Sequence, residues 1–176
     1  MIQREILIGV SGGIAAYKAA DLVSKLVQSG HSVSVAMSRA AAQFVGAPTF
    51  AALSGHAVTT DLFDPTYPLG AHIELARRAD LFCVAPATAN FLARAANGFG
   101  DDLLSALYLS FEGGVIMAPA MNQEMWAKPS VQRNVQRLKE DGVTFVGPDE
   151  GWLSCRDKGM GRMSDVADIL HAIDSV

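Results

Sequence analysis

The sequence contains a thiol, an imidazole and an amide in settings where each could act on a ligand. Cys155 lies in a glycine-bearing stretch that could fold over a bound molecule. His72 follows a loop with prolines and a glycine, where an imidazole could act as an acid or base or could serve only as a helix cap or surface residue. Asn122 follows an apolar run and Pro119, so its amide could cap a helix or face a ligand. The second thiol, Cys83, lies inside an apolar run and is predicted to be a core residue.

Small polar residues at three strand-to-helix junctions could bind a phosphate. The first junction, Ser11-Gly12-Gly13-Ile14, offers backbone N–H groups and a helix N-terminus, although a tight turn would use the same glycines. The second has Ser38 after the next strand, where serine is also a common helix cap. The third junction consists of Ala87, Thr88, Ala89 and Asn90. Because the first junction is neither GxGxxG nor a Walker loop, the three together predict a pocket of neutral donors for a mononucleotide with one phosphate.

These residues can meet only if the elements between them form a parallel sheet. Apolar strands alternate with helices, which predicts an α/β fold of three layers with a Rossmann- or flavodoxin-like parallel sheet and helices on both faces. The expected strands are 5–10, 31–37, 81–85, 115–118 and 143–146. The expected helices are 14–28, a piece that begins at Ser38, 48–55, 71–79, 86–97, 101–109, 129–140 and 164–173, with loops at 61–70 and 148–161. The junctions and Asn122 would then converge at the carboxyl edge of the sheet, where ligands bind in such folds.

Length and composition narrow the classes of protein. The 176 residues are expected to form one domain, 1–176, and a hydrophobic content of 50% with only 18% charged residues favours a homo-oligomer. A net charge of −4 without a basic stripe gives no indication of nucleic acid or a membrane surface as partner. The start of the chain lacks the features of a secretion signal, so we expect a cytoplasmic location. Two cysteines are too few for a disulfide framework and are badly spaced for zinc, so no metal site is predicted.

The sequence resembles the homo-oligomeric flavin-containing cysteine decarboxylases over nearly all of its length. Pro119-Ala120-Met121-Asn122-Gln123-Glu124-Met125-Trp126 fits the family signature P-x-M-N-x-x-M-W at every defined position. His72-Ile73-Glu74-Leu75 is similar to the motif that holds the family's active-site histidine, and Pro86-Ala87-Thr88-Ala89-Asn90 resembles its P-A-S-A-N-T flavin motif. Gly159-x-Gly161-Arg162-Met163, which follows Cys155, is similar to its substrate flap.

The resemblance implies a cofactor, a reaction and a role for each residue. It implies that FMN is the cofactor and that 4′-phosphopantothenoylcysteine is oxidatively decarboxylated to 4′-phosphopantetheine in coenzyme A biosynthesis, through thioaldehyde and enethiol intermediates. It implies that His72 acts in oxidation of the thiol, that Asn122 binds the substrate carboxylate, and that Cys155 gives the proton for the final reduction. The implied FMN-binding residues are Ser11, Gly12, Gly13, Ile14, Ser38, Ala87, Thr88, Ala89 and Asn90. The implied substrate-binding residues are Met121, Asn122, Arg77 and Met163.

Two positions depart from the family pattern. Phe91 stands where the flavin motif usually ends in threonine, which removes one hydrogen bond near the flavin phosphate. Arg156 follows Cys155 where the family often has glycine, which lowers the expected mobility of the flap.

Several alternatives stay open from the sequence. The substrate could be a peptide with a C-terminal cysteine, although a decarboxylase that stops at the enethiol would not need Cys155. A flavin prenyltransferase has a related fold but would not need Asn122 in this motif or a flap cysteine. A flavin-binding regulatory subunit is a non-enzymatic alternative, and an electron-transfer flavoprotein is disfavoured by His72, Asn122 and Cys155 together. The resemblance implies a trimer or a dodecamer with FMN at the subunit boundary. We expect the synthetase that supplies the substrate to be a separate chain.

Overall fold

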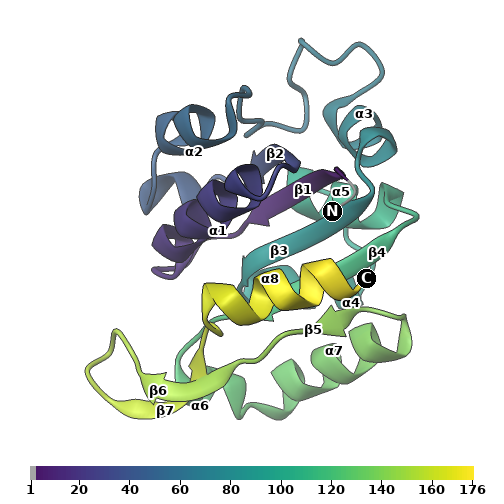
Figure 1. The fold of residues 1–176 in the computed structure, drawn as a ribbon. Coiled ribbons are helices and arrows are strands. Elements are labelled where there is room, and N and C mark those ends of the chain that lie inside the picture. Colours follow the sequence, from purple (N-terminus) through teal and green to yellow (C-terminus); the bar gives the residue numbers. More distant parts are fainter. Residues whose placement is uncertain (1–2) are drawn as a thin grey trace.

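A five-stranded parallel sheet forms the centre of the computed structural model, which describes residues 3–176 (Figure 1). The strands are β1 (Glu5–Val10), β2 (Ser32–Met37), β3 (Leu81–Ala87), β4 (Gly114–Pro119) and β5 (Thr144–Phe145). Their order is β2-β1-β3-β4-β5 and every pairing is parallel. The strand order therefore reverses between β1 and β3, which is the switch point where open α/β sheets bind ligands. The predicted fold class is confirmed.

Helices cover both faces of the sheet because its inner strands are apolar on both sides. The helices are α1 (Ala16–Gln28), η1 (Ala41–Gln43), α2 (Ala47–Ser54), α3 (Ala71–Arg78), α4 (Ala89–Ala96), α5 (Leu103–Ser110), α6 (Gln123–Trp126), α7 (Pro129–Glu140) and α8 (Val166–Ser175). Ile6 and Ile8 pack with α1 and α8 on one face, whereas Leu7 between them packs with α4, α5 and α7 on the other (Figure 1). This alternation along β1 places one hydrophobic core on each side of the sheet.

Three predicted boundaries were wrong for local reasons. The predicted helix 86–97 begins only at Ala89, because Pro86 is still part of β3 and Thr88 caps α4. Ser38 does not open an α-helix: its hydroxyl accepts a hydrogen bond from Ala41 N–H at 3.1 Å and is followed by the single 3₁₀ turn η1. Pro119 is the last residue of β4, opposite Ala87, so the strand extends one residue further than 115–118 predicts.

The largest correction concerns the predicted loop 148–161. This segment is an antiparallel hairpin of β6 (Asp149–Trp152) and β7 (Lys158–Arg162), which we call the flap (residues 149–162). The flap projects from the body of the protein beside α6 (Figure 1). Its strands lack an apolar alternation, because the buried positions of β7 are Gly159 and Gly161. The hydrophobic pattern that identifies a half-buried strand is therefore missing from its sequence.

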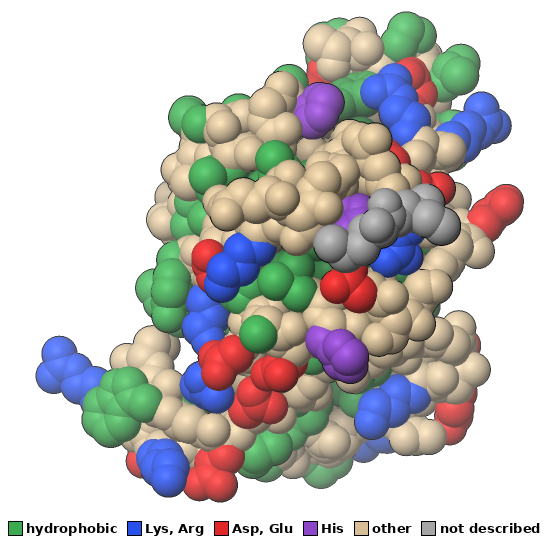
Figure 2. Space-filling view, in the orientation of Figure 1, with side chains coloured by type: hydrophobic (Ala, Val, Ile, Leu, Met, Phe, Trp, Pro, Cys, Tyr) green, Lys and Arg blue, Asp and Glu red, His purple; other side chains and the backbone are tan. Residues whose placement is uncertain are grey.

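The surface around the flap carries charges of both signs. In the orientation of Figure 1, acidic and basic side chains are interspersed on this face, and the flap extends at the lower left (Figure 2). Among residues 3–176, no helix combines the length and the apolar character that a membrane span requires.

Candidate functional site

A cavity of about 850 Å³ opens at the carboxyl edge of the sheet. It is lined by the segments that follow β1, β2, β3 and β4 and by the tip of the flap. The predicted site residues that line it are Ser11, Gly12, Gly13, Ile14, Ser38, Thr88, Ala89, Asn90, Met121, Asn122, Cys155 and Met163. Ala87 is fully buried opposite Pro119 and lies outside the cavity lining, as do His72 and Arg77. Four separate turns of the chain thus converge on one cavity.

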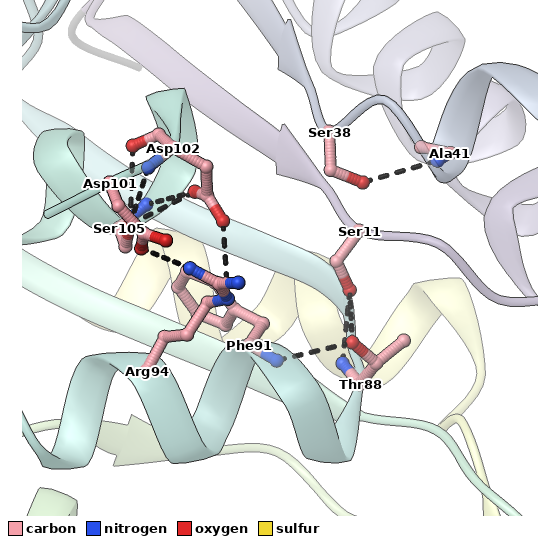
Figure 3. Close-up of polar contacts among 9 residues, drawn as sticks. All are labelled: Ser11, Ser38, Ala41, Thr88, Phe91, Arg94, Asp101, Asp102 and Ser105. Carbon is pink, nitrogen blue, oxygen red and sulfur yellow. Dashed lines mark hydrogen bonds and ion pairs between the residues drawn. The ribbon is translucent and has the colours of Figure 1, made fainter. Parts of the chain in front are cut away.

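The first and third junctions are joined through the buried hydroxyl of Ser11 (Figure 3). Ser11 Oγ donates a hydrogen bond to Pro86 O at 2.6 Å and accepts one from Thr88 N–H at 3.0 Å. Thr88 Oγ1 lies 3.2 Å from Ser11 Oγ and accepts a hydrogen bond from Phe91 N–H at 3.4 Å, so Thr88 caps α4. We call Ser11, Gly12, Gly13, Ser38 and Thr88 the phosphate cradle. Its shape is set by bonds between residues that are far apart in the sequence.

Backbone donors in the cradle remain available to a ligand. Within residues 3–176, the N–H groups of Gly12 and Ile14 donate to no other protein atom. The N-terminus of α4 also borders the cavity, and its first-turn N–H groups have no backbone partner within the helix. A Cβ on Gly12 would lie 2.3 Å from Ala40 Cβ and 2.9 Å from the Ala40 carbonyl carbon. Glycine is therefore required at this position by a close approach of two backbone segments.

Arg94 forms a charged group on another side of the cavity (Figure 3). Its Nη1 donates to Asp101 Oδ1, and its Nε lies 3.5 Å from Asp102 Oδ2 without forming a hydrogen bond, although Nε is buried. The hydrogen bond with Asp101 raises the pKa of Arg94 and lowers the pKa of the Asp101 carboxyl. Asp102 also accepts from Ser105 N–H at 2.8 Å in a capping box that begins α5. The shifts favour the ionised forms of Arg94 and Asp101, and the buried Nε of Arg94 makes no hydrogen bond within residues 3–176.

The side-chain amide of Asn122 caps a helix with its oxygen and places its nitrogen on the cavity side. Its Oδ1 accepts hydrogen bonds from Glu124 N–H at 2.8 Å and Met125 N–H at 3.4 Å, which caps α6. Its Nδ2 lies on the cavity side, 3.5 Å from Cys155 Sγ at the tip of the flap. The thiol of Cys155 is exposed, whereas Cys83 is fully buried in β3, as predicted. The structure thus brings Asn122 and Cys155 together across the mouth of the cavity.

His72 and Arg77 lie on α3, away from the cavity of their own chain. His72 is half-buried at the start of the helix, and its buried Nδ1 atom has no hydrogen-bond partner in the described part of the chain, residues 3–176. Arg77 is exposed one and a half turns further along. Within a single chain, these two predicted site residues do not join the others.

Several residues that line the cavity were not predicted from the sequence. They are Lys18, Leu62, Phe63, Arg94, Asp101, Asp102 and Trp152. Arg94 and Asp102 belong to different helices, and no local spacing relates them. Phe63 and Trp152 could have been identified from the sequence, because both are aromatic residues in predicted loops. Large apolar side chains that are exposed in this way often mark a binding site.

The two departures from the family pattern have visible consequences. The Phe91 side chain is buried in the core beside α5, so only its backbone N–H takes part in the Thr88 cap. Arg156 has φ 67°, the left-handed region that glycine adopts at no steric cost. This explains why glycine is favoured at that position of the flap tip.

Known proteins resemble this chain over almost its whole length. A family model described as Flavoprotein matches residues 1–176. The coenzyme A biosynthesis bifunctional protein CoaBC of Bacillus subtilis (strain 168) is 47% identical over 168 residues, which cover 95% of this chain and 41% of that protein. The chain therefore spans less than half the length of this relative.

Two solved structures share the fold. The FMN-dependent cysteine decarboxylase SpaF aligns with a TM-score of 0.84 and 34% identity, covering 99% of this chain and 98% of SpaF. A cysteine-to-serine variant of a PPC decarboxylase, complexed with pantothenoylaminoethenethiol, aligns with a TM-score of 0.89 and 27% identity, covering 99% of this chain and 98% of that protein.

Proposed function

This chain belongs to the Flavoprotein family, and on that premise we propose that it is an FMN-dependent decarboxylase that converts 4′-phosphopantothenoylcysteine to 4′-phosphopantetheine in coenzyme A biosynthesis. The observation that carries the proposal is the pairing of Asn122 Nδ2 with Cys155 Sγ, 3.5 Å apart, over a cavity that also contains a phosphate cradle. An amide and a thiol in this position suit a substrate that bears both a carboxylate and a sulfur atom.

The residues that line the cavity fit FMN. Unpartnered N–H groups at Gly12 and Ile14 and the N-terminus of α4 suit a phosphate dianion without a fixed cation. The volume of about 850 Å³ lies in the upper part of the range typical of cofactor and ligand sites. Arg94, on another side of the cavity, offers a donor to the polar edge of a flavin ring. When bound, FMN supplies the two-electron oxidation of the substrate CH₂–SH group and returns the same two electrons at the end.

Asn122 binds the substrate carboxylate through hydrogen bonds from its amide. Because Oδ1 is occupied by the α6 cap, the group directed at the cavity is the Nδ2 donor. A neutral donor orients the carboxylate without the strong ground-state attraction of a fixed positive charge, which would oppose the loss of CO₂. Met121 lies next to this group and provides an apolar contact for the substrate.

Cys155 completes the reaction by giving a proton to the enethiol that remains after CO₂ leaves. Its thiol is at the cavity mouth, within reach of the group that Asn122 orients. The structurally similar PPC decarboxylase variant, in which a cysteine is replaced by serine, was captured with an ethenethiol compound. A missing thiol proton donor would leave such a compound unreduced, which supports this role.

We further propose that the active enzyme is a homo-oligomer, a trimer or an assembly of trimers, in which His72 and Arg77 of one copy complete the cavity of a neighbour. Both residues lie outside the cavity of their own chain, and the buried Nδ1 of His72 has no partner within residues 3–176. Large apolar side chains at the cavity rim, such as Phe63 at 85% exposed and Tyr17 at 61%, would be covered by such a neighbour. A cytoplasmic location stays part of the proposal, and the two free cysteines support it.

Measurements on the purified protein and on two variants test the proposal. The purified protein should be yellow with the spectrum of FMN and should release CO₂ from 4′-phosphopantothenoylcysteine, forming one 4′-phosphopantetheine per CO₂. Cys155→Ser should release CO₂ but stall at the enethiol, whereas His72→Asn should keep FMN and lose CO₂ release. Mixing these two variants should restore product if His72 acts across a subunit boundary. A protein that binds no FMN, or that releases no CO₂ from this compound, would contradict the proposal.

A peptide with a C-terminal cysteine is the control substrate. The 34% identity to the cysteine decarboxylase SpaF makes it the strongest competing substrate class. Faster CO₂ release from the peptide than from 4′-phosphopantothenoylcysteine would move the assignment to that class.

A further inference from the structure

The flap is closed onto the turn before α6 by three contacts. Met121 N–H donates to Gly161 O at 2.9 Å, and Asn122 Nδ2 lies 3.5 Å from Cys155 Sγ. The third contact joins side chains, with Gln123 Nε2 donating to Asp157 Oδ2 at 3.2 Å. Three consecutive residues of one segment thus hold three points of the flap.

The closeness of this contact depends on two glycines of β7. A Cβ on Gly161 would lie 2.2 Å from Met121 O, and a Cβ on Gly159 would lie 1.7 Å from Gln123 Oε1. The backbone of β7 therefore lies directly against the Gln123 side chain. This packing directs the amide of Gln123 toward the flap tip rather than toward solvent.

Asp157 and Cys155 lie in the same tight turn at the flap tip, so their positions are coupled. Leu153 N–H donates to Asp157 O at 2.8 Å and Arg156 N–H donates to Leu153 O at 2.9 Å, which closes a tight turn. Leu153 is buried, whereas Cys155 is exposed and its thiol has Asn122 as its sole hydrogen-bond partner among residues 3–176. A turn closed in this way moves as a unit, so a bond at Asp157 restrains the thiol two residues earlier.

We infer that Gln123 and Asp157 form a latch that holds the flap closed and so positions the Cys155 thiol for the last step of the reaction. This inference rests on the proposed function. In that step the two electrons taken earlier from the substrate return as a hydride equivalent, which adds with the Cys155 Sγ–H proton across the enethiol C=C bond. The product is the saturated CH₂–CH₂–SH group, and the Cys155 thiolate regains a proton from water. Gln123 and Asp157 are positioning residues, since neither touches the reacting atoms.

The latch can be opened and closed again by changing charge alone. Gln123→Glu keeps the shape of the side chain and its packing on Gly159, but sets two carboxylates against each other. Adding Asp157→Asn to this variant restores an amide–carboxylate hydrogen bond with its direction reversed. Gln136→Glu is the matched control, because Gln136 Nε2 donates to the Glu140 carboxylate at 2.9 Å on α7, away from the cavity.

The first measurement is the ratio of 4′-phosphopantetheine to CO₂. Both rates are followed in a single anaerobic turnover with enzyme in excess over substrate, because each CO₂ released without product leaves two electrons on the enzyme. For Gln123→Glu we expect the rate of CO₂ release to stay within about twofold of wild type and the rate of product formation to fall about tenfold, with the enethiol accumulating, because a partly exposed hydrogen bond to a carboxylate holds the thiol. The double variant should recover to within about threefold of wild type, and Gln136→Glu should match wild type. An unchanged ratio in Gln123→Glu, or an equal loss of CO₂ and product, would overturn the latch.

The second measurement does not need the reaction. Trypsin can cut after Arg156 and Lys158, which are exposed at the flap tip. In the FMN-free protein, Gln123→Glu should raise the rate of cleavage at these sites about tenfold, and the double variant should return it to the wild-type rate. Equal cleavage rates in wild type and Gln123→Glu would count against the latch even if wild type releases no CO₂. A wild type without CO₂ release would contradict the proposed function alone.

Discussion

The phosphate cradle and the flap border the same cavity but are held in opposite ways. The cradle is fixed by the buried Ser11 hydroxyl, which bonds to Pro86 O and Thr88 N–H on the neighbouring segment. The flap consists mainly of exposed residues and is attached to the Met121–Gln123 segment by a few contacts, at Cys155 and Asp157 in its tip and at Gly161 near its base. A cofactor that stays bound needs a preformed site, whereas a substrate that enters and leaves needs a part that opens. The difference predicts where substitutions act on binding and where they act on turnover.

The two cysteines give the largest expected contrast between the sheet and the flap. At pH 8, iodoacetamide should modify Cys155 at least about a thousandfold faster than Cys83, because exposing Cys83 requires opening of the sheet. Burial also raises the pKa of the Cys83 thiol to about 12. Mass spectrometry after timed labelling measures both rates, with labelling in denaturant as the control. Comparable rates in the native protein would show that the sheet is not the rigid region.

The raised pKa of Cys83 also has a consequence for stability. The folded protein favours the neutral thiol, so this contribution is complete below the ordinary pKa of 9.0 and is lost as the pH rises from there toward 12. The midpoint of urea denaturation should therefore fall over this pH range more in wild type than in Cys83→Ala.

Adding a side chain at Gly12 should weaken FMN binding more than removing the Ser11 hydroxyl does. Gly12→Val places side-chain atoms where Ala40 already lies, which pushes apart the junctions after β1 and β2. We expect the Kd for FMN, from titration of flavin fluorescence, to rise about a hundredfold. Gly46→Val is the control, because Gly46 has ordinary backbone angles and a Cβ there would lie 3.4 Å from Pro48 Cδ, away from the cavity. Equal effects of the two substitutions would mean that the cradle is no more rigid than a surface turn.

Removing the Ser11 hydroxyl should have a smaller effect of the same kind. Ser11→Ala leaves the Thr88 N–H without its acceptor in a buried site and should lower the free energy of unfolding by about 1–3 kcal/mol. The Kd for FMN should rise about tenfold because Thr88 is less well placed. Ser110→Ala removes a half-buried hydroxyl whose one hydrogen-bond partner among residues 3–176 is Ala106 O, so its effect on unfolding should be smaller and FMN binding should not change. A larger loss of stability in Ser110→Ala would contradict the assignment of Ser11 as the link between the junctions.

The alternation of apolar strands and helices was enough to predict the sheet and the junctions at its carboxyl edge. The strands and the convergence of Ser11, Ser38, Thr88 and Asn122 follow from that pattern, because parallel strands share one carboxyl edge. The strand order β2-β1-β3-β4-β5 was not predicted. The predicted boundaries shifted at two places. Pro86 is part of β3 rather than of the next helix, and Ser38 caps a 3₁₀ turn rather than an α-helix. These shifts moved no predicted residue between faces of the sheet.

The flap and the charged side of the cavity were not predictable from local sequence patterns. The backbone of Gly159 and Gly161 packs against the Met121–Gln123 segment. Glycines at the buried positions of β7 produce no hydrophobic pattern in the sequence. Arg94 and Asp102 meet only because α4 and α5 pack together. His72 was identified through family resemblance, and its place outside the cavity of its own chain could not be read from a motif.

The capping role of Asn122 gives this side chain a fixed orientation. Two backbone N–H groups of α6 hold its carbonyl end, so the amide cannot turn over and its N–H₂ end has one direction in space. An aspartate would cap the helix equally well but would turn an oxygen, in place of the N–H₂ group, toward the cavity. The oxygen of this side chain thus stabilises a helix, and the nitrogen offers N–H donors to the cavity. Asparagine is the side chain that provides both.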